Sequence, residues 1–410
     1  MKILFLLFSS PSTCDGVGLR HFHFIRCLST RNDVALLSFK DPTEKWDFTP
    51  ELQEYCSTVI SIPLVVPKKL LSYQMVKAIM RITKNIFSLE NKSCRISNLL
   101  NFYYSPKMQR ELREMISTES FDAIYTHPFM GSYVANINLP KIIDFIDALS
   151  DFYYQTYKLQ GNTLIKMYYL FRYLTVKNQE KRLYKAFDTR IVISPFDKDI
   201  LESYLPDSNF FVIPQGVDTN YFTKTDIEED FPSLAFEGNF ANPHNGAAII
   251  HFYNNIYPLI QQRIPEVKLY IIGSNAPSEV LKLASDKSVI VTGYVEDIRP
   301  YLAKSSIALA PMISGTGVKN KILEAMAMSK PVVSTSMGIH GIDATPEENI
   351  IIADEPVEFG NRVVELLNNA KLREKLSCQG RKLVESKYSW ERMADMLDEL
   401  LEKAVKRQPI

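Results

Sequence analysis

One stretch decides the fold of this chain: Met312 to Gly341, which reads MISGTGVKNKILEAMAMSKPVVSTSMGIHG. It follows a short apolar run at Ile307–Ala310, and from Val318 its apolar residues recur at helical spacing. Lys330-Pro331 ends the predicted helix, because proline cannot continue a helix and disfavours the helical conformation of its predecessor. Val332-Val333 then begins the next strand. The order strand, glycine loop, helix, strand predicts a βαβ unit, and therefore a parallel sheet.

The glycine loop of this unit predicts a nucleotide site. Glycine lets backbone N–H groups approach a ligand, and the amino end of a helix favours negative charge. Lys319 and Lys321 fall in the first helical turn, where the helix dipole opposes cations unless an anion neutralises them. Glu324 lies three residues after Lys321 on the same face and suits the hydroxyl groups of a sugar. We expect a diphosphate at the loop and a ribose at Glu324; the alternative is a plain turn with solvated lysines.

Two common phosphate-binding motifs do not match this loop. A dinucleotide fingerprint would need its third glycine at the position of Asn320. A Walker loop would need a Gly-Lys-Ser or Gly-Lys-Thr triplet at its end, and none follows at the required spacing. The nucleotide is therefore expected to be held in another way.

Length and composition predict an ordinary globular protein of two domains. A chain of 410 residues is too long for one compact core. Its 46% of apolar and 23% of charged residues are typical of globular proteins. The 47 basic residues balance 47 acidic ones, so no general affinity for nucleic acid is expected.

The sequence favours a cytoplasmic location. Five scattered cysteines without a Cys-x-x-Cys pair argue for a reducing compartment and against a disulfide framework or a zinc site. Met1–Phe8 is predicted as a first strand rather than a signal peptide, because its apolar run is short and no cleavage region follows. No window approaches the roughly 20 apolar residues of a membrane span.

A second glycine loop follows that first strand. It contains Gly16 and Gly18, and Arg20 opens the helix behind it. Strands are also predicted at Phe121–His127 and Lys141–Asp147, and polar residues at the carboxyl ends of parallel strands face the crevice that binds ligands. His127 and Asp147 are therefore candidate site residues, with a satisfied loop histidine as the alternative for His127. For Arg20 the alternative to a site role is a helix-surface charge. No third ligand accompanies Asp144 and Asp147 at a useful spacing, so we expect no metal site.

The segment 64–115 differs from the rest of the chain in charge. It carries ten basic residues against three acidic ones, a net charge of +7 in an otherwise neutral protein. Apolar residues run between the charges, and a basic amphipathic helix is typical of a membrane surface. We expect a peripheral contact with an anionic membrane here; the alternative is a helix that covers the first domain with its charges in water.

The segment Tyr153–Tyr173 is rich in aromatic residues. Aromatic rings stack on sugar rings and also lie at membrane interfaces, and core packing is the third interpretation. The aromatic residues concerned are Tyr153, Tyr154, Tyr157, Tyr168, Tyr169, Phe171 and Tyr173.

The run GTGVKNKILEAMAMSKPVVST, followed by Gly338 and Gly341, resembles the donor-site signature of retaining GT-B glycosyltransferases of family four. It is most similar to the polysaccharide-biosynthesis subgroup with a Gly-x-Gly-x-Lys-x-Lys-x-x-Glu-Ala-Met pattern. The resemblance implies an α/β fold of two doubly wound Rossmann-like domains facing across a cleft. It implies an acceptor-side domain at 1–222, a donor-binding domain at 223–387 and a C-terminal helix at 388–407 that crosses back to the first domain.

The resemblance also implies roles for individual residues. Catalytic roles fall to His127, Lys319 and Glu324, with His127 beside the donor sugar and Glu324 on the ribose. The segment Asp147-Ala148-Leu149-Ser150 resembles an acceptor-binding segment, with Asp147 and Ser150 as its contacts. The donor-binding residues are Gly16, Gly18, Arg20, Gly238, Asn239, His244, Asn245, Gly273, Tyr294, Val295, Ser314, Gly315, Thr316, Gly317, Val318 and Lys321.

Two departures from the family pattern stand out. The first of its two bracketing glutamates would fall at Thr316, which has no carboxylate. The loop after Gly238, which usually supplies an Arg and a Lys to the diphosphate, holds Asn239 and then His244 or Asn245. We expect Lys319 and Lys321 to supply the missing positive charge.

The expected function is a retaining, metal-independent glycosyltransferase that needs no cofactor beyond its nucleotide-diphosphate sugar. Its acceptor is expected to be a glycan or a lipid-linked glycan in polysaccharide synthesis. Two alternatives stay open: a GT-B sugar-nucleotide epimerase, which would need no acceptor, and an inactive GT-B scaffold that binds glycan or membrane.

Overall fold

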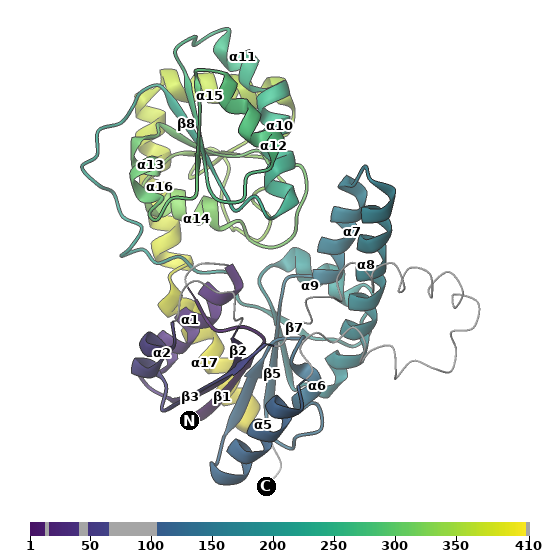
Figure 1. The fold of residues 1–410 in the computed structure, drawn as a ribbon. Coiled ribbons are helices and arrows are strands. Elements are labelled where there is room, and N and C mark those ends of the chain that lie inside the picture. The colour runs from purple at the N-terminus through teal and green to yellow at the C-terminus, as the bar shows by residue number, and fades with distance from the viewer. Residues whose placement is uncertain (13–15, 41–47, 65–104, 407–410) are drawn as a thin grey trace. The chain divides into compact units, whose positions relative to one another are not determined.

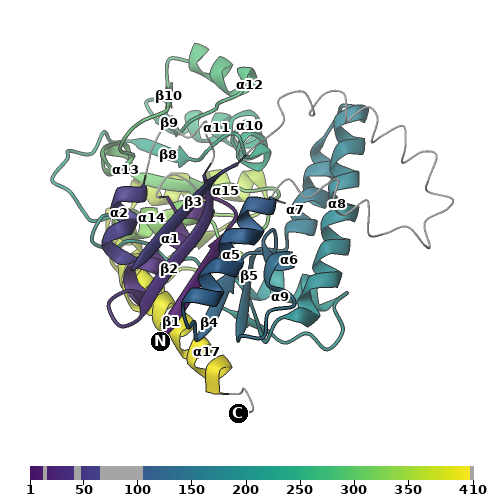
Figure 2. The same cartoon turned by 60° about the horizontal axis from the view of Figure 1, so that its bottom comes forward.

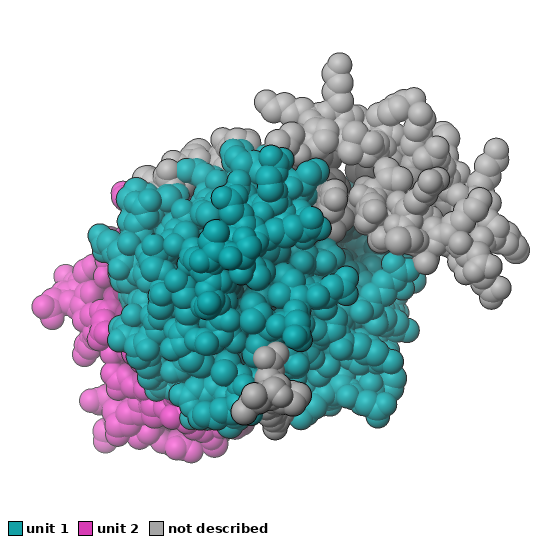
Figure 3. All heavy atoms as spheres, turned by 90° about the horizontal axis from the view of Figure 1, so that it is seen from below, with its two compact units in different colours: residues 1–192, 198–212, 394–410 teal, residues 193–197, 213–393 magenta. Residues whose placement is uncertain are grey.

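The computed structural model describes residues 1–12, 16–40, 48–64 and 105–406, which form two compact units (Figure 3). Unit 1 holds Met1–Val192, Lys198–Val212 and Ala394–Ile410, and unit 2 holds Ile193–Asp197 and Ile213–Met393. The chain thus passes into unit 2 after Val212, before the boundary that the sequence predicts at residue 222.

Unit 1 is built on a parallel seven-stranded sheet in the order β3-β2-β1-β4-β5-β6-β7 (Figure 1). Its central strands are nearly continuous apolar runs, as strands buried on both faces must be. The strands are β1 (Lys2–Leu7), β2 (Asp33–Lys40), β3 (Thr58–Pro63), β4 (Ala123–Thr126), β5 (Lys141–Ile146), β6 (Thr189–Val192) and β7 (Phe210–Val212).

Helices cover both faces of this sheet, because each parallel connection needs a crossover. Leu4 and Leu6 of β1 share a core with Met108 of one helix, while Phe24 of another packs edge-on against Tyr125 of β4. The helices are α1 (Gly16–Leu28), α2 (Thr49–Tyr55), α5 (Pro106–Thr118), α6 (Gly131–Val134), α7 (Leu149–Leu159), α8 (Thr163–Leu183) and α9 (Pro195–Glu202).

Unit 2 is built on a parallel six-stranded sheet in the order β10-β9-β8-β11-β12-β13. The strands are β8 (Ser233–Glu237), β9 (Lys268–Ile272), β10 (Val289–Gly293), β11 (Ile307–Ala310), β12 (Val332–Ser334) and β13 (Ile351–Ile352). The helices are α10 (Pro243–Asn255), α11 (Tyr257–Gln261), α12 (Ser278–Leu281), α13 (Arg299–Lys304), α14 (Asn320–Ala327), α15 (Pro356–Asn368) and α16 (Ala370–Lys387).

Each sheet has one place where its winding reverses. In unit 1 the chain goes from β1 outward to β2 and β3, and then returns to β4 on the other side of β1. In unit 2 it goes from β8 outward to β9 and β10, and then returns to β11. Loops leave such a switch point in opposite directions, so the crevice at the carboxyl ends of β1 and β4, and of β8 and β11, is where ligands bind in open α/β sheets.

The two parallel sheets with their crossover helices confirm the predicted fold class. The C-terminal helix α17 (Trp390–Lys406) begins in unit 2 and continues in unit 1 from Ala394, as a returning helix must. Within unit 1 it is tied down by Asp398, whose carboxylate lies 2.9 Å from Arg31 Nε and accepts a 3.0 Å hydrogen bond from Asn32.

The helix of the βαβ unit is shorter at both ends than the sequence predicts. α14 begins at Asn320 rather than Val318, because Lys319 is extended with φ −92° and ψ 98° and acts as its N-cap. It ends at Ala327, before Pro331 can act, and Ser329 follows in the left-handed region with φ 55°. Helix α16 has no counterpart among the elements predicted from the sequence.

The predicted membrane segment 64–115 falls mostly outside the described residues, which resume at 105 with the Ser105 cap of α5. None of the described helices combines the length and the apolar content that a bilayer span requires.

Candidate active site

The carboxyl ends of β8 and β11 bring two loops together at the switch point of unit 2. Two side-chain hydrogen bonds join the elements that follow these strands. Lys321 Nζ donates to Asn245 Oδ1 at 2.9 Å, and His244 Nδ1 lies 2.7 Å from Ser314 Oγ. Four of the predicted donor residues therefore meet, two from the start of α10 and two from the stretch around the glycine loop.

The glycine loop after β11 is held in a shape that glycine favours. Gly315 has φ +119° and Gly317 has φ +68°, which residues with a side chain rarely adopt. Lys319 curls back over the loop, so that its Nζ donates to the carbonyl oxygens of Thr316 at 2.6 Å and Gly317 at 2.8 Å. Lys319 thus fixes the loop in this structure, and its contact with a diphosphate stays a prediction.

Lys321 lies in a partly buried position where its charge is costly. Its ammonium group lies 3.9 Å from the centre of the Phe236 ring as well as against Asn245. Burial lowers the pKa of Lys321 to about 7, although the nearby charge of Glu237 opposes this shift. An anion bound beside Lys321 would raise that pKa again, so anion binding and proton binding are coupled here.

Glu237 and Glu324 form a pair of neighbouring carboxyl groups in the same place. Glu237 ends β8 and is buried, and neither of its carboxyl oxygens has a hydrogen-bond partner of good geometry. Burial raises the pKa of Glu237 well above its usual value, and the adjacent Glu324 raises it further. Burial also raises the pKa of Glu324, against the effects of Glu237 and Lys321. Glu324, the residue that the sequence assigns to the ribose, therefore lies beside a second carboxyl group, that of Glu237.

His244 is a neutral hydrogen-bonding group rather than a cation. It is buried at the start of α10, where its backbone N–H donates to the side-chain oxygen of the capping Asn242 at 3.0 Å. Burial lowers the pKa of His244 to about 4, and the charge of Lys319 lowers it further. The imidazole thus links Ser314 to α10 without adding positive charge.

Glycine at 238 and 273 lets the ends of β8 and β9 approach closely. Gly273 has φ +139°, and a Cβ there would lie 1.9 Å from the carbonyl oxygen of Gly238. A Cβ at Gly238 would lie 2.8 Å from Asn245 Nδ2 and 3.2 Å from Lys321 Nζ. Gly238 is therefore required by the packing of the charged group, and Gly273 by the close approach of the Gly238 backbone.

Asn239 adjoins this group through its backbone, because its carbonyl oxygen accepts a 2.8 Å hydrogen bond from Asn245 Nδ2. Its side chain is exposed, and Oδ1 accepts hydrogen bonds of 3.0 Å from Ala241 N–H and from the Asn275 amide. Tyr294, which is 68% exposed, and the partly buried Val295 follow β10, which β9 separates from β8. Val318 packs against the apolar cluster around α14.

His127 follows β4 at the switch point of unit 1. It is buried beside Phe8 and Phe129, with ring centroids at 4.5 Å and 4.9 Å. Its Nδ1 accepts the N–H of Phe129 at 3.2 Å, which places the ring proton on Nε2. Burial, assisted by His21, lowers the pKa of His127 to about 3, so it is a neutral donor and not a general acid at neutral pH.

Arg20 is committed to a buried ion pair in unit 1. Gly16 and Gly18 open α1, and the Arg20 side chain behind them is fully buried. Its Nε donates to Asp144 Oδ2 at 2.7 Å, and the Tyr125 hydroxyl donates to the same oxygen at 2.5 Å. The pair ties α1 to β5, and the predicted contact of Arg20 with donor phosphates stays a prediction.

The predicted acceptor segment leads into a hydrogen-bond network. Ser150 is buried at the start of α7, where its Oγ lies 2.8 Å from the Tyr204 hydroxyl and its N–H donates to Glu180 at 3.2 Å. Tyr204 also donates to Glu180 at 2.7 Å. Burial raises the pKa of Glu180 to about 7, against these hydrogen bonds. Asp147 is partly exposed next to this network.

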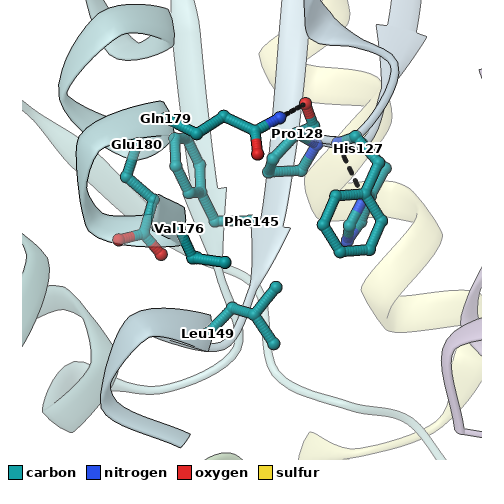
Figure 4. A pocket seen from close by; sticks show the side chains of 8 residues that line it. His127, Pro128, Phe145, Leu149, Val176, Gln179 and Glu180 are labelled. Carbon is teal, nitrogen blue, oxygen red and sulfur yellow. Dashed lines mark hydrogen bonds between the residues drawn. The ribbon is translucent and has the colours of Figure 1, made fainter. Parts of the chain in front are cut away.

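A small pocket in unit 1 connects His127 with this network (Figure 4). On one side Gln179 of α8 donates to the Pro128 carbonyl at 3.2 Å. The pocket brings the predicted catalytic histidine close to the start of α7. The lining residues are His127, Pro128, Phe129, Phe145, Leu149, Val176, Gln179 and Glu180.

Sequence reasoning did not single out Glu237 or Glu180. The sequence does contain a signal for Glu237, which is a charged residue at the carboxyl end of the apolar strand Ser233–Glu237. Glu180 has no such signal, since its partners Ser150 and Tyr204 lie 30 and 24 residues away along the chain. Within the described ranges, no group of three or more His, Cys, Asp or Glu side chains could hold a metal ion.

The unit 2 group combines a titrating amine, a glycine loop at a helix amino end and a carboxyl pair. Such a group can bind an anion at Lys321 and accept hydrogen bonds from hydroxyl groups at Glu324. The unit 1 pocket brings a neutral imidazole, an amide and a carboxyl together beside apolar walls, in a cavity of about 10 Å³ that has room for about one water molecule.

Two family models match the chain. The model described as Glycosyltransferase Family 4 matches residues 16–221, and the model described as Glycosyl transferases group 1 matches residues 232–369. Together they cover the unit 2 sheet and all strands of the unit 1 sheet except β1.

Curated relatives are similar at modest identity. One is the "Uncharacterized 44.6 kDa protein in cps region" of Klebsiella pneumoniae, 24% identical over 75% of this chain and 82% of its own. Another is the capsular polysaccharide biosynthesis glycosyltransferase CapM of Staphylococcus aureus, 26% identical over 43% of this chain and 50% of its own.

Solved structures resemble the whole chain in fold. Sucrose-phosphate synthase from Thermosynechococcus elongatus superimposes with a TM-score of 0.68 at 15% identity, over 99% of this chain and 100% of its own. HepE of Anabaena in complex with UDP-glucose superimposes with a TM-score of 0.63 at 15% identity, over 98% and 100% of the two chains.

Proposed function

Because this chain belongs to Glycosyltransferase Family 4 and has the GT-B fold, we propose that it moves a sugar from a nucleoside-diphosphate sugar to a glycan or lipid-linked acceptor. We further propose that the transfer retains the donor's anomeric configuration and serves polysaccharide synthesis. The observation that carries the proposal is the meeting of Lys321, Asn245 and Glu324 at the unit 2 switch point.

The donor nucleotide is assigned to unit 2. The diphosphate lies at the glycine loop, where Lys321 carries a pKa of about 7 that an anion would raise, and where Lys319 is the second cation. The ribose hydroxyls donate to Glu324, whose ionised form the neighbouring Lys321 favours. HepE, whose fold this chain shares, was solved with UDP-glucose, which supports a nucleotide sugar as the donor class.

The chemistry assigned to this group is the stabilisation of a leaving diphosphate. The bond between the anomeric carbon and the diphosphate oxygen breaks, and its electron pair stays on the diphosphate. The acceptor hydroxyl bonds to that carbon and passes its proton to the departing diphosphate oxygen, through an oxocarbenium-like transition state. Asn245 holds Lys321 and Lys319 holds the loop, so both are positioned before the charge on the diphosphate develops.

We propose that no metal ion takes part in this step. Two lysines and a helix amino end supply the positive charge that a divalent cation would otherwise bring to the diphosphate. Asn239, His244 and Asn245 stand where the family usually has cations, which makes Lys319 and Lys321 the charge that remains.

Unit 1 is assigned to the transferred sugar and the acceptor. His127 is neutral with its proton on Nε2, so it donates a hydrogen bond to a sugar hydroxyl rather than a proton to the leaving group. Asp147, two residues before α7, is the proposed contact for the acceptor hydroxyl. We also propose a cytoplasmic protein that meets an anionic membrane through 64–115.

The test is an assay of transfer with a product of known configuration. The full chain is incubated with UDP-, GDP- and ADP-sugars and with lipid-linked or free glycan acceptors, and the new linkage is read by NMR. The proposal predicts one donor whose sugar is transferred with retained configuration, with or without a chelator. An inverted product contradicts the retaining mechanism, and activity lost to the chelator contradicts metal independence.

Two other outcomes would replace the proposal. Conversion of the nucleotide sugar into its epimer without an acceptor would identify an epimerase. Nucleotide binding without transfer or donor hydrolysis, over the whole panel, would identify an inactive scaffold.

A further inference from the structure

The hairpin of α7 and α8 has a surface that neither the fold nor the candidate site explains. In Figures 1 and 2 the two helices lie side by side and extend past the end of the unit 1 sheet. In α7 the buried residues are Ser150 and Thr156, and in α8 they begin only at Val176. No side chain from Thr163 to Thr175 is buried, so this half of α8 does not belong to the core of unit 1.

Large apolar side chains are concentrated on this half of the hairpin. Six of the thirteen that are exposed among the described residues lie between Leu159 and Leu174. A cluster of this kind on one projecting element indicates an interaction surface, whereas single exposed apolar residues do not. The exposed fractions are Leu159 37%, Leu164 66%, Ile165 43%, Met167 39%, Leu170 36% and Leu174 57%.

The apolar residues of α8 are not confined to the face that meets α7. Leu164, Met167, Leu170 and Leu174 recur at spacings of three, three and four residues, which place them on one face of α8. The residues of α8 that contact α7 side chains, Tyr169, Arg172 and Tyr173, lie on a different face. Helix α7 therefore leaves this apolar face uncovered, so the face requires a partner.

The charges on the half of this hairpin nearest its turn have a single sign, whereas Asp151 in the first turn of α7 and the buried Glu180 near the end of α8 are acidic. From Gln155 to Gln179 the sequence contains Lys158, Lys166, Arg172 and Lys177 and no acidic residue. Each of these cations lies over a tyrosine ring: Lys158 over Tyr154 at 4.3 Å, Lys166 over Tyr157 at 4.9 Å, Arg172 over Tyr153 at 4.9 Å and Lys177 over Tyr173 at 5.3 Å. Tyrosines and long cationic side chains beside exposed leucines are typical of the zone between lipid headgroups and acyl chains.

We propose that the α7–α8 hairpin docks on an anionic lipid bilayer. The turn between the helices and the first half of α8 enter the headgroup region, with the leucines and Ile165 directed to the acyl chains and the cations at the phosphates. The positive charge selects this partner, because a second copy of the hairpin would bring like charge against like charge. The residues that form this surface lie outside the segment 64–115, and the proposal does not depend on the proposed sugar transfer.

The experiment measures co-sedimentation of the purified full chain with vesicles. One set contains equal parts of phosphatidylglycerol and phosphatidylcholine, and the other contains phosphatidylcholine alone. The chain is expected to bind the anionic vesicles, with binding that weakens as salt is added. The double variant Leu164→Ser/Ile165→Ser is expected to bind about tenfold more weakly because it loses apolar insertion. Lys158→Gln/Lys166→Gln is expected to lose about tenfold through lost attraction.

Matched variants separate the hairpin from the rest of the surface. Leu281→Ser removes a leucine that is 52% exposed on unit 2, and Lys371→Gln removes an exposed lysine of unit 2. Both are expected to bind vesicles as the unchanged chain does. All four side chains of the hairpin variants lie outside the core, so the thermal unfolding midpoint should stay within a degree or so of the unchanged chain.

Three results would overturn the proposal. The first is binding to neither vesicle, or equal binding to both. The second is binding that Leu164→Ser/Ile165→Ser leaves unchanged while Lys77→Gln/Arg81→Gln/Lys84→Gln abolishes it, which would assign the contact to 64–115. The third is a dimer in light scattering that Leu164→Ser/Ile165→Ser dissociates, which would assign the surface to a second copy of the chain.

Discussion

At the edge between β8 and β11, unit 2 brings together three ionisable groups, Lys321, Glu237 and Glu324. Burial shifts the pKa of each group in the direction that favours its uncharged form. At the corresponding edge between β1 and β4, unit 1 gathers Phe8, Phe129 and a histidine that stays neutral. The same parallel topology places both groups. The side chains, not the topology, decide that one edge suits a charged ligand and the other an uncharged one.

The cations next to the two glycine loops show the same contrast. Arg20 behind the first loop is closed in a buried ion pair with Asp144. Lys321 behind the second donates to the neutral amide of Asn245, and no carboxylate in the described part of the chain lies within ion-pair distance of it. A cation that is neutralised inside its unit stabilises the fold, whereas one that is not remains available to an anion.

The largest expected effect comes from removing that cation. Lys321→Ala should lower kcat/KM for the nucleotide sugar by about 10²–10³, because it removes a preorganised donor to the leaving diphosphate. Steady-state kinetics with the donor found in the transfer assay measure it. The control is Lys371→Ala, an exposed lysine of the same unit, which should leave kcat/KM unchanged. Equal values for both variants would remove Lys321 from the mechanism.

The next effect concerns the close approach of β8 and β9. Gly273→Ala should destabilise unit 2 by about 3 kcal/mol, because the new Cβ meets the Gly238 carbonyl and the backbone is strained. Gly293→Ala is the matched control, since Gly293 also has a positive φ, +68°, but a Cβ there meets open space. It should cost about 1 kcal/mol. Thermal unfolding of both variants measures the difference, and equal midpoints would show that backbone strain alone matters.

The unit 1 edge should respond in a different way. His127→Ala should lower turnover about tenfold, because one hydrogen bond to an uncharged sugar is lost. Nucleotide affinity should not change, since the nucleotide is assigned to unit 2. Because the pKa of His127 is about 3, the ratio of wild-type to variant turnover should be constant from about pH 5 to pH 8. A ratio that varies across this range would make His127 a proton-transfer group.

The smallest effect is a shift in the pH dependence of nucleotide binding. Lys321 has a pKa of about 7 that a bound anion raises, so binding takes up a proton above pH 7 and affinity falls as the pH rises. The charge of Glu237 raises the pKa of Lys321, so Glu237→Gln should move the onset of this fall to lower pH. Calorimetry in buffers of different ionisation enthalpy measures the proton uptake. If Glu237→Gln leaves the pH at which affinity begins to fall unchanged, the charge of Glu237 does not control the pKa of Lys321.

Local pattern was enough to predict the fold class and part of the site. The alternation of strand and helix, the glycine loops, and the spacing of Lys321 and Glu324 all lie within short windows of sequence. The rest depends on pairings across the chain. Arg20 meets Asp144 over a separation of 124 residues, and Glu237 becomes a neighbour of Glu324 only because β8 lies beside β11. Such contacts leave no periodic signal, so burial of Arg20 and the carboxyl pair could not be predicted.

The central claim is that the unit 2 switch point holds a diphosphate through Lys321. Calorimetric titration with UDP, GDP and ADP, each against its own monophosphate, tests this most directly. For the base that binds, the diphosphate should bind at least about tenfold more tightly than the monophosphate, and Lys321→Ala should abolish most of that difference. A preference for the diphosphate that survives in Lys321→Ala, or no preference in the unchanged chain, would contradict the claim.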